Sequence, residues 1–408
     1  MLRALAAAAV AAVVFDICAQ PAHGASCDMT LERALEIARE RAPSVLAARA
    51  RIDEARAQLA GASRLLRSNP EIEADAGPRF SDEGDTTDVR AKLSQAFELG
   101  GARAARIDAA AADVAREEAS ADDAQRTAQR EVAEAFLRAR AAEELLIVAE
   151  DAASGADELQ RAAERRHRAG DVAILEVAVA RASAAHARAE AGAARAARRE
   201  AVGKLAVLLG QDVDVPPRPC GPLRAPEPLE LPELLRRAPE RGDLRALGAE
   251  IGAAEAEARL GAARAWPELR IGTEYKREEG DDIYLGGVGF SVPIFDRGEA
   301  ARAAAEARAR RLRLELAAAE RAVSADVRTA WEVQRELDAA AGELERVVPE
   351  LDDAEKLARA SYDAGELSLA DFLQLRRETL ELRRARIEHA LAAALARVAV
   401  QAQARVLR

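Results

Sequence analysis

The chain has 408 residues, of which 32% are charged and only 3% aromatic, and Ala, Arg and Glu dominate. This composition is typical of long helices and coiled coils rather than of compact enzymes. The formal net charge is -11, with basic and acidic residues interspersed. Because no basic patch stands out, we expect no nucleic-acid partner.

The N-terminus has the features of an export signal. Arg3 precedes an apolar run over residues 4–15, which is too short to span a bilayer, and small residues suited to cleavage follow. We therefore assign residues 1–25 to a signal peptide. No later segment has the length of uncharged apolar sequence that a transmembrane helix requires.

Two cysteines, Cys27 and Cys220, remain after such cleavage. Each lies just ahead of the first predicted helix of its half of the chain, so a disulfide between them is expected in an oxidising compartment. Alternatively, Cys27 is a lipid-acceptor cysteine, because small residues precede it. That motif is imperfect, since it lacks Leu at the third upstream position.

The rest of the sequence is one unit used twice. Ser68-Asn69-Pro70-Glu71 returns as Ala265-Trp266-Pro267-Glu268, and Arg168-Ala169-Gly170-Asp171 returns as Asp363-Ala364-Gly365-Glu366. The motifs return at nearly constant spacing, which indicates an internal structural repeat. Each half is predicted to run helix, two strands, very long helix, glycine turn and returning helix.

The first repeat is assigned to residues 26–210. Thr30 caps its opening helical segment and Pro43 divides it. Periodicity then predicts these elements: strands at 70–80 and 88–97, a long helix over 101–168 and a return helix over 172–209.

A proline-rich linker over 211–230 separates the repeats, and the second repeat covers 231–408. Its predicted elements are strands at 267–277 and 283–293, a long helix over 299–363 and a return helix over 367–407. Each long helix would span roughly 100 Å at 1.5 Å per residue and needs packing partners along its length.

The predicted strands alternate apolar and polar residues, as in Glu71-Ile72-Glu73-Ala74-Asp75-Ala76. This pattern separates a lipid face from a lumen face in outer-membrane strands. Four strands cannot close a barrel, and open edges are not tolerated in a bilayer. Three chains would supply twelve strands, with the long helices extending the tube on one side of the membrane.

Two motifs resemble a known family. They are Ser291-Val292-Pro293-Ile294-Phe295-Asp296-Arg297-Gly298, before a long Ala-rich helix, and the segment from Tyr362 to Leu373 at a predicted hairpin tip. On these residues the chain resembles the TolC-like outer-membrane factors, the exit ducts of bacterial tripartite efflux and type I secretion systems. Within that family, Leu31-Glu32-Arg33-Ala34-Leu35 is similar to the opening of heavy-metal (cobalt–zinc–cadmium) efflux subunits.

The resemblance implies a mainly α fold with a small β part. It implies a homotrimer in which a periplasmic α-helical barrel is capped by a 12-stranded outer-membrane β-barrel, four strands per chain. The implied partners are outer-membrane lipid, a periplasmic adaptor and an inner-membrane pump of the resistance–nodulation–division (RND) class. The strands hold fewer aromatic residues than outer-membrane barrels usually carry.

The resemblance also suggests where function resides. Glu176 and Asp371 occupy the same repeat position and are expected to face a pore constriction, with contributions from Tyr362 and Gln374. A ring of carboxylates concentrates cations, which is a common basis of cation selectivity. The adaptor is expected to dock at the hairpin tips, formed by Arg168, Gly170, Asp171, Gly365, Glu366 and Ser368.

The sequence shows no constellation typical of an enzyme. It contains no nucleophile elbow, phosphate loop or Cys-x-x-Cys motif, and its histidines lack ligand-spaced neighbours. We therefore expect no catalytic residue, no cofactor and no metal site. The leading hypothesis is a passive efflux duct for metal ions or small toxic compounds. The alternatives are a type I protein secretion channel and a periplasmic coiled-coil scaffold.

Overall fold

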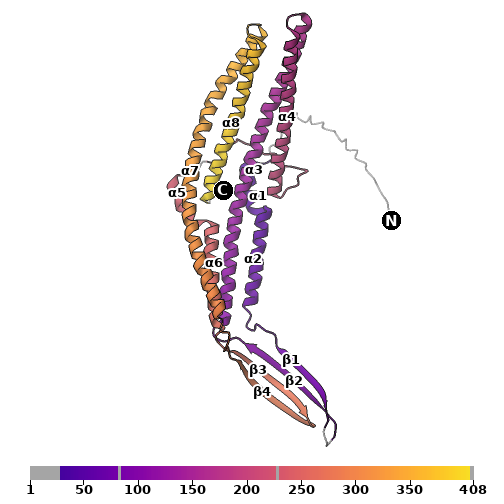
Figure 1. Cartoon of the computed structure of the whole chain (residues 1–408), viewed down its shortest axis with the longest axis vertical. Coiled ribbons are helices and arrows are strands. Elements are labelled where there is room, and N and C mark those ends of the chain that lie inside the picture. The colour runs from indigo at the N-terminus through magenta and orange to yellow at the C-terminus, as the bar shows by residue number, and fades with distance from the viewer. Residues whose placement is uncertain (1–27, 81–83, 227–228, 405–408) are drawn as a thin grey trace, which may run out of the picture.

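The computed structural model describes residues 28–80, 84–226 and 229–404. The molecule is a long bundle of helices with a four-stranded sheet at one end and two helical hairpins at the other (Figure 1). The predicted mainly helical fold with a small antiparallel sheet is thus confirmed. The proposed signal peptide and Cys27 lie outside the described residues.

The first repeat begins with α1 (Leu31–Arg41) and α2 (Pro43–Ala62). Thr30 caps α1 by accepting a hydrogen bond from the backbone N–H of Arg33, and Pro43 occupies the first turn of α2, where its missing N–H costs nothing. The remaining elements are β1 (Glu71–Arg79), β2 (Thr86–Phe97), α3 (Ala102–Ala169) and α4 (Ile174–Leu209).

The second repeat has the same order. Its elements are α5 (Leu231–Arg237), a 3-10 turn (Ala238–Glu240), α6 (Gly242–Ala263), β3 (Glu268–Glu278), β4 (Asp281–Ser291), α7 (Glu299–Asp363) and α8 (Leu369–Gln403). Pro349 lies inside α7 without ending it. Strand β4 stops at Ser291, short of the predicted end at 293, because its partner β3 begins at Glu268, which pairs with Ser291.

Small side chains let the long helices pack closely. The buried positions of α3 are mostly alanines, and α3 lies along α4, α6 and α2 over much of its length. Each alanine buries little surface, so stability comes from many contacts spread over the roughly 100 Å length of the helix.

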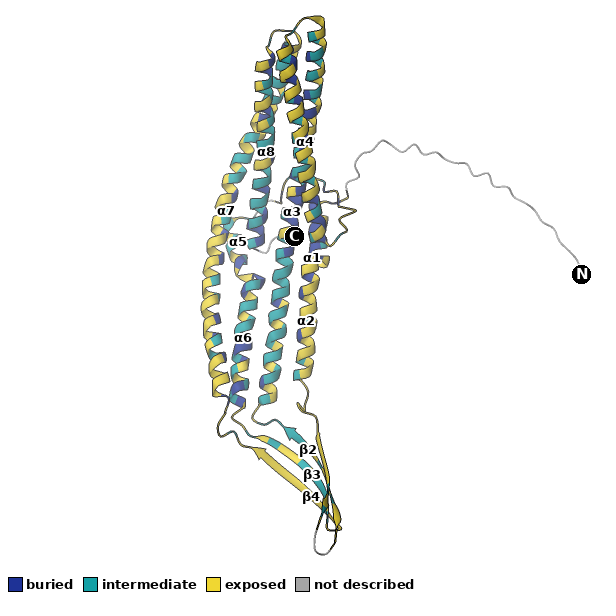
Figure 2. Ribbon diagram, turned by 45° about the vertical axis from the view of Figure 1, so that its right-hand side comes forward, coloured by how far each residue is buried: buried dark blue, intermediate teal, exposed yellow. Residues whose placement is uncertain are grey.

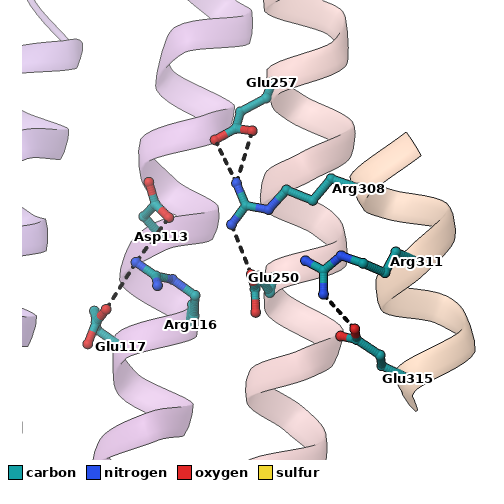
Figure 3. Close-up of polar contacts among 8 residues, drawn as sticks. All are labelled: Asp113, Arg116, Glu117, Glu250, Glu257, Arg308, Arg311 and Glu315. Carbon is teal, nitrogen blue, oxygen red and sulfur yellow. Dashed lines mark hydrogen bonds and ion pairs between the residues drawn. The ribbon is translucent and has the colours of Figure 1, made fainter. Parts of the chain in front are cut away.

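Ion pairs add cross-links between these helices (Figure 3). Arg308 of α7 donates to Glu250 at 2.9 Å and pairs with Glu257 at 3.3 Å, both on α6. The hydrogen bond to Glu250 raises the pKa of Arg308. Figure 3 also shows pairs within single helices: Arg311 with Glu315, and Arg116 with Asp113 and Glu117. Such partly exposed pairs each contribute little, so their number matters.

Larger apolar side chains gather midway along the molecule. One cluster joins α1, α3, α4 and α8 through residues such as Leu35, Phe136, Leu205 and Val398. A second cluster around Leu234 joins α5 and α6 to α7 and α8. The first core ties the two repeats together, and the second lies within the second repeat. The sheet is more exposed than the middle of the molecule (Figure 2). No described helix is both long and apolar enough to cross a membrane.

The sheet is antiparallel, with strand order β1-β2-β3-β4. Both hairpins pair in equivalent register, with Ile72 opposite Leu93 in the first and Leu269 opposite Phe290 in the second. The central β2–β3 pairing joins the two repeats, with Phe97 opposite Leu269. Among the described residues, β1 and β4 each pair on one side only, so the sheet has two open edges.

Candidate functional site

The two faces of the sheet differ sharply in chemistry. Directly paired residues of antiparallel strands share a face. The register therefore gathers apolar side chains on one face: Ile72, Ala74, Ala76, Val89, Ala91, Leu93, Leu269, Ile271, Val288 and Phe290. Several of them are largely exposed, Ile72 at 77% and Val288 at 65%. An exposed apolar face of this extent requires a covering phase or partner.

The opposite face is charged. Most of its charged side chains come from β1, β2 and β3, whereas β4 places Ile283 and Leu285 there. The charged residues include Glu71, Glu73, Asp75, Arg79, Asp88, Arg90, Lys92, Glu268, Arg270, Glu274 and Lys276. Cross-strand pairs order it: Arg90 bonds Asp75 at 2.6 Å, and Arg79 bonds Asp88 at 2.8 Å. This face is suited to water.

The few aromatic residues on the apolar face lie at its two ends. Phe97 and Phe290 share a row at the helical end. Tyr275 and Tyr284 pack together toward the other end, with ring centroids 5.2 Å apart. Along β3 these rows lie at Leu269 and Tyr275, six residue steps or about 20 Å apart. The shortage of aromatic residues noted in the sequence therefore coincides with an arrangement in two bands.

A tight junction connects the sheet to the helices. Gly100 and Gly101 both have positive φ, 65° and 78°, and they turn the chain from β2 into α3. A Cβ at Gly100 would lie 2.0 Å from the indole Cγ of Trp266, whereas a Cβ at Gly101 would meet nothing within 4 Å. Glycine at position 100 thus gives Trp266 room to pack across the junction.

At the opposite end, glycines close both helical hairpins. Gly170 ends α3 with φ 86°, and the Asp171 N–H donates to the Arg166 carbonyl at 2.9 Å. Gly365 has φ 80° just beyond α7, and the Glu366 N–H donates to the Ser361 carbonyl at 2.9 Å. These are helix endings that favour glycine. The structure thus places the predicted tip residues on the two turns, and Arg168 and Ser368 are exposed there.

A buried tyrosine connects the two hairpins near these tips. Tyr362 of α7 is only 2% exposed, and its hydroxyl donates to Oε1 of Glu176 on α4 at 3.2 Å. Its ring stacks on Phe372 with centroids 5.4 Å apart, and the Arg166 guanidinium lies 5.5 Å from its centroid. Burial and the neighbouring Glu176 carboxylate raise the pKa of Tyr362. Sequence reasoning missed Arg166, because nothing in the local pattern indicates which tyrosine it faces.

The two repeat-equivalent carboxylates have different surroundings. Glu176 is half-buried against Tyr362, while Asp371 is exposed in the first turn of α8. Ser368 accepts from the Asp371 N–H at 3.2 Å and donates to its carboxylate at 2.6 Å, which is a capping arrangement. Gln374 is exposed and donates to Glu378 at 3.3 Å. The fold brings Tyr362 and Glu176 into contact, and it leaves Asp371 and Gln374 exposed on the single chain.

A further link between the hairpins was not apparent from the sequence. Arg376 of α8 donates to the Ala152 carbonyl of α3 at 3.1 Å, beside Gly155, where a Cβ would approach its guanidinium to 2.3 Å. Burial lowers the pKa of Arg376. The glycine on α3 and the arginine on α8 lie far apart in the sequence and form no recognisable motif, so only the fold reveals the pair.

The other predicted sites are partly described. Met29 and Cys220 are neighbours: the Cys220 N–H donates to the Met29 carbonyl at 2.9 Å. Cys27 itself lies outside the described residues, so its disulfide stays a prediction. Within the described part of the chain, no group of three or more His, Cys, Asp or Glu side chains is arranged to hold a metal ion.

Comparison with known proteins agrees with this geometry. The model of the family "Outer membrane efflux protein" matches residues 34–211 and 233–406. The cobalt-zinc-cadmium resistance protein CzcC of Cupriavidus metallidurans is 26% identical over 87% of this chain and 85% of its own length. The pyoverdine export outer membrane protein OpmQ of Pseudomonas putida is 28% identical over 85% of this chain and 79% of its own.

Solved structures show the same fold. The CmeC outer membrane channel of Campylobacter jejuni superposes with a TM-score of 0.78 at 17% identity, covering 92% of this chain and 86% of its own. A structure of CusC gives 0.74 at 17% identity, with 95% of each chain covered. The family match covers most of the first repeat and most of the second, on either side of the linker. The chain is therefore a member of the outer membrane efflux protein family, the TolC-like channels of the outer membrane with a large periplasmic helical part.

Proposed function

We propose that this protein is the outer-membrane exit duct of a tripartite efflux system and works as a homotrimer. Three sheets of four strands close into a 12-stranded barrel in the membrane, and three sets of long helices continue it as a periplasmic tube. The duct is passive. An RND pump in the inner membrane supplies the energy and a periplasmic adaptor connects the two.

The observation that carries this proposal is the two-faced sheet with open edges. Its apolar face fits lipid and its charged face fits a water-filled lumen. Unpaired edges inside a bilayer are costly, because backbone N–H and C=O groups find no water there. Closure with further copies removes the edges. A periplasmic coiled-coil scaffold, the alternative from the sequence, would leave this apolar face in water.

Near the hairpin tips we propose the periplasmic constriction of the pore. Glu176, Asp371, Gln374 and Tyr362 contribute to it, and threefold symmetry multiplies the carboxylates into a ring that favours cations. The hydrogen bond from Tyr362 to Glu176 supports this placement, since it ties the α7/α8 hairpin to the α3/α4 hairpin at that level. The exposed turns at Gly170 and Gly365 are the proposed docking site of the adaptor.

For the cargo we propose metal ions or small toxic compounds. The similarity to CzcC, a cobalt-zinc-cadmium resistance protein, favours metal cations, and the carboxylates at the tips are compatible with them. The similarity to OpmQ, a pyoverdine export protein, favours a small organic compound. A type I protein secretion channel is the second candidate, because the same family serves both kinds of system.

Assembly and cargo are tested separately. Detergent-extracted protein should have the mass of three chains by light scattering corrected for bound detergent, and a stable folded monomer would contradict the architecture. For cargo, a strain lacking the gene is complemented with the wild-type gene, and the same strain carrying the empty vector is the non-exporting control. Restored resistance to cobalt, zinc and cadmium would support metal efflux. If the strain lacking the gene tolerates these metals as well as the parent strain but no longer secretes a protein, the type I secretion channel is favoured instead.

A further inference from the structure

The apolar face of the sheet carries one pair of charged residues. Register and alternation place Arg277 of β3 and Asp282 of β4 directly opposite each other on this face, and every other charged residue of β1–β4 lies on the charged face. A charged side chain on a lipid face is costly at the bilayer midplane and costs little near the membrane interfaces. The level of Arg277 along its strand therefore decides what its side chain meets.

Arg277 lies just beyond the tyrosine band of the apolar face. Tyr275 and Tyr284 are directly opposite each other, and Arg277 follows one row further, two residues or about 7 Å along the strand. This row adjoins the β3–β4 turn, at the end of the sheet farthest from the helices (Figure 1). The helical part of this family is periplasmic, so that end faces the outer leaflet. Because tyrosines mark the headgroup level of a membrane, Arg277 lies among lipid headgroups.

Two hydrogen-bond donors at this level have no partner in the described part of the chain. Asp282 faces Arg277, but its carboxylate accepts the Tyr275 hydroxyl at 2.7 Å, and no ion pair links it to Arg277. The Arg277 side chain is exposed. Tyr284 is 77% exposed, and its ring packs on Tyr275 while its hydroxyl bonds to no described residue. A guanidinium and a phenol in adjacent rows of one face are thus left for a ligand outside the chain.

We propose that Arg277, together with the hydroxyl of Tyr284, binds a phosphate group of an outer-leaflet lipid. This inference rests on the proposed closure of the sheet into a membrane barrel and adds a lipid site on the outer wall. The guanidinium presents a planar fork of N–H donors that matches two phosphate oxygens. The carboxylate of Asp282 limits the affinity, because it repels the same phosphate. A homotrimer carries three such sites.

Lipid titration of the detergent-extracted trimer tests this site. The probe is lipid A, the phosphorylated glycolipid of bacterial outer leaflets, and native mass spectrometry counts the bound molecules for the wild type and for Arg277→Gln. We expect the substitution to weaken binding about tenfold or more, which is the order expected on losing charge-assisted hydrogen bonds. Lipid A stripped of its phosphates should bind the wild type as weakly as intact lipid A binds the variant. Light scattering checks that both proteins are trimers.

The neighbouring residue supplies a matched control. Lys276 carries the same charge, but it lies on the charged face and pairs with Glu274 at 3.3 Å. Lys276→Gln should leave the affinity for lipid A within about twofold, because its paired charge lies across the sheet from the lipid. Asp282→Asn should strengthen binding by roughly threefold, since it removes a like charge about one strand spacing from the phosphate.

Each result has a distinct meaning. Unchanged affinity in Arg277→Gln, or equal weakening by Lys276→Gln, would overturn the site, and so would equal binding of lipid A without phosphates. Competition by phosphatidylglycerol that Arg277→Gln abolishes would support the site and extend it to phospholipids. Displacement of lipid A by millimolar inorganic phosphate would show a free-anion site and overturn the lipid assignment. A wild-type protein that is monomeric by light scattering would instead refute the proposed barrel itself.

Discussion

Replacing Gly100 with alanine should damage the junction between sheet and helices far more than the same change at Gly101. Both glycines have positive φ, so alanine at either position costs about 1–3 kcal/mol of backbone strain. Only at Gly100 would the new Cβ collide with Trp266, at 2.0 Å from its Cγ. The indole must therefore leave its position in that variant.

The structure gives the size of the extra cost. Trp266 is 61% exposed, so about two-fifths of its surface lies against the junction. For a side chain that can bury roughly 250 Å² this is about 100 Å², or about 2.5 kcal/mol at about 25 cal/mol per Å². We expect Gly100→Ala to lower the free energy of unfolding by about 3.5–5.5 kcal/mol and Gly101→Ala by about 1–3 kcal/mol.

The assay is denaturant unfolding of the detergent-solubilised protein followed by far-ultraviolet circular dichroism, with the trimer-to-monomer transition on gels as a second measure. Circular dichroism is chosen because the chain has two tryptophans, and changing one alters fluorescence. In a Trp266→Gly background, which also removes the Trp266 Cβ that lies 2.5 Å from the added Cβ, the two alanine substitutions should cost the same. Equal costs of Gly100→Ala and Gly101→Ala in the wild-type background would refute the reasoning.

Three further experiments test the tips and the cysteines. Replacing Glu176 with Gln and Asp371 with Asn should lower cation selectivity and weaken block by divalent cations in planar bilayers while trimers persist; unaltered selectivity would remove both residues from the pore. Gly365→Leu, which forces φ 80° on a branched residue at an open turn, should leave trimers intact and abolish export; normal cargo resistance would move adaptor docking elsewhere. Peptide mapping without reductant should find Cys27 linked to Cys220, and an acylated Cys27 would contradict the disulfide.

The sequence alone predicted most of the elements. Hydrophobic periodicity, the prolines at 43, 70 and 267 and the glycines at 170 and 365 are local signals, and each acts on the backbone where it stands. A glycine with positive φ ends a helix whatever surrounds it, so Gly170 and Gly365 could be placed without a fold. The duplication could also be recognised, because equivalent local signals recur in the same order.

Tertiary structure alone decided which side chains meet. Strand alternation predicted two chemical faces, but the β2–β3 register was needed to bring four strands into one apolar face and one charged face. Glu176 and Asp371 look equivalent in the sequence, yet only Glu176 meets Tyr362, because that contact depends on how α7 packs beside α4. Contacts between residues distant in the chain depend on the packing of whole helices, and no local pattern encodes that packing.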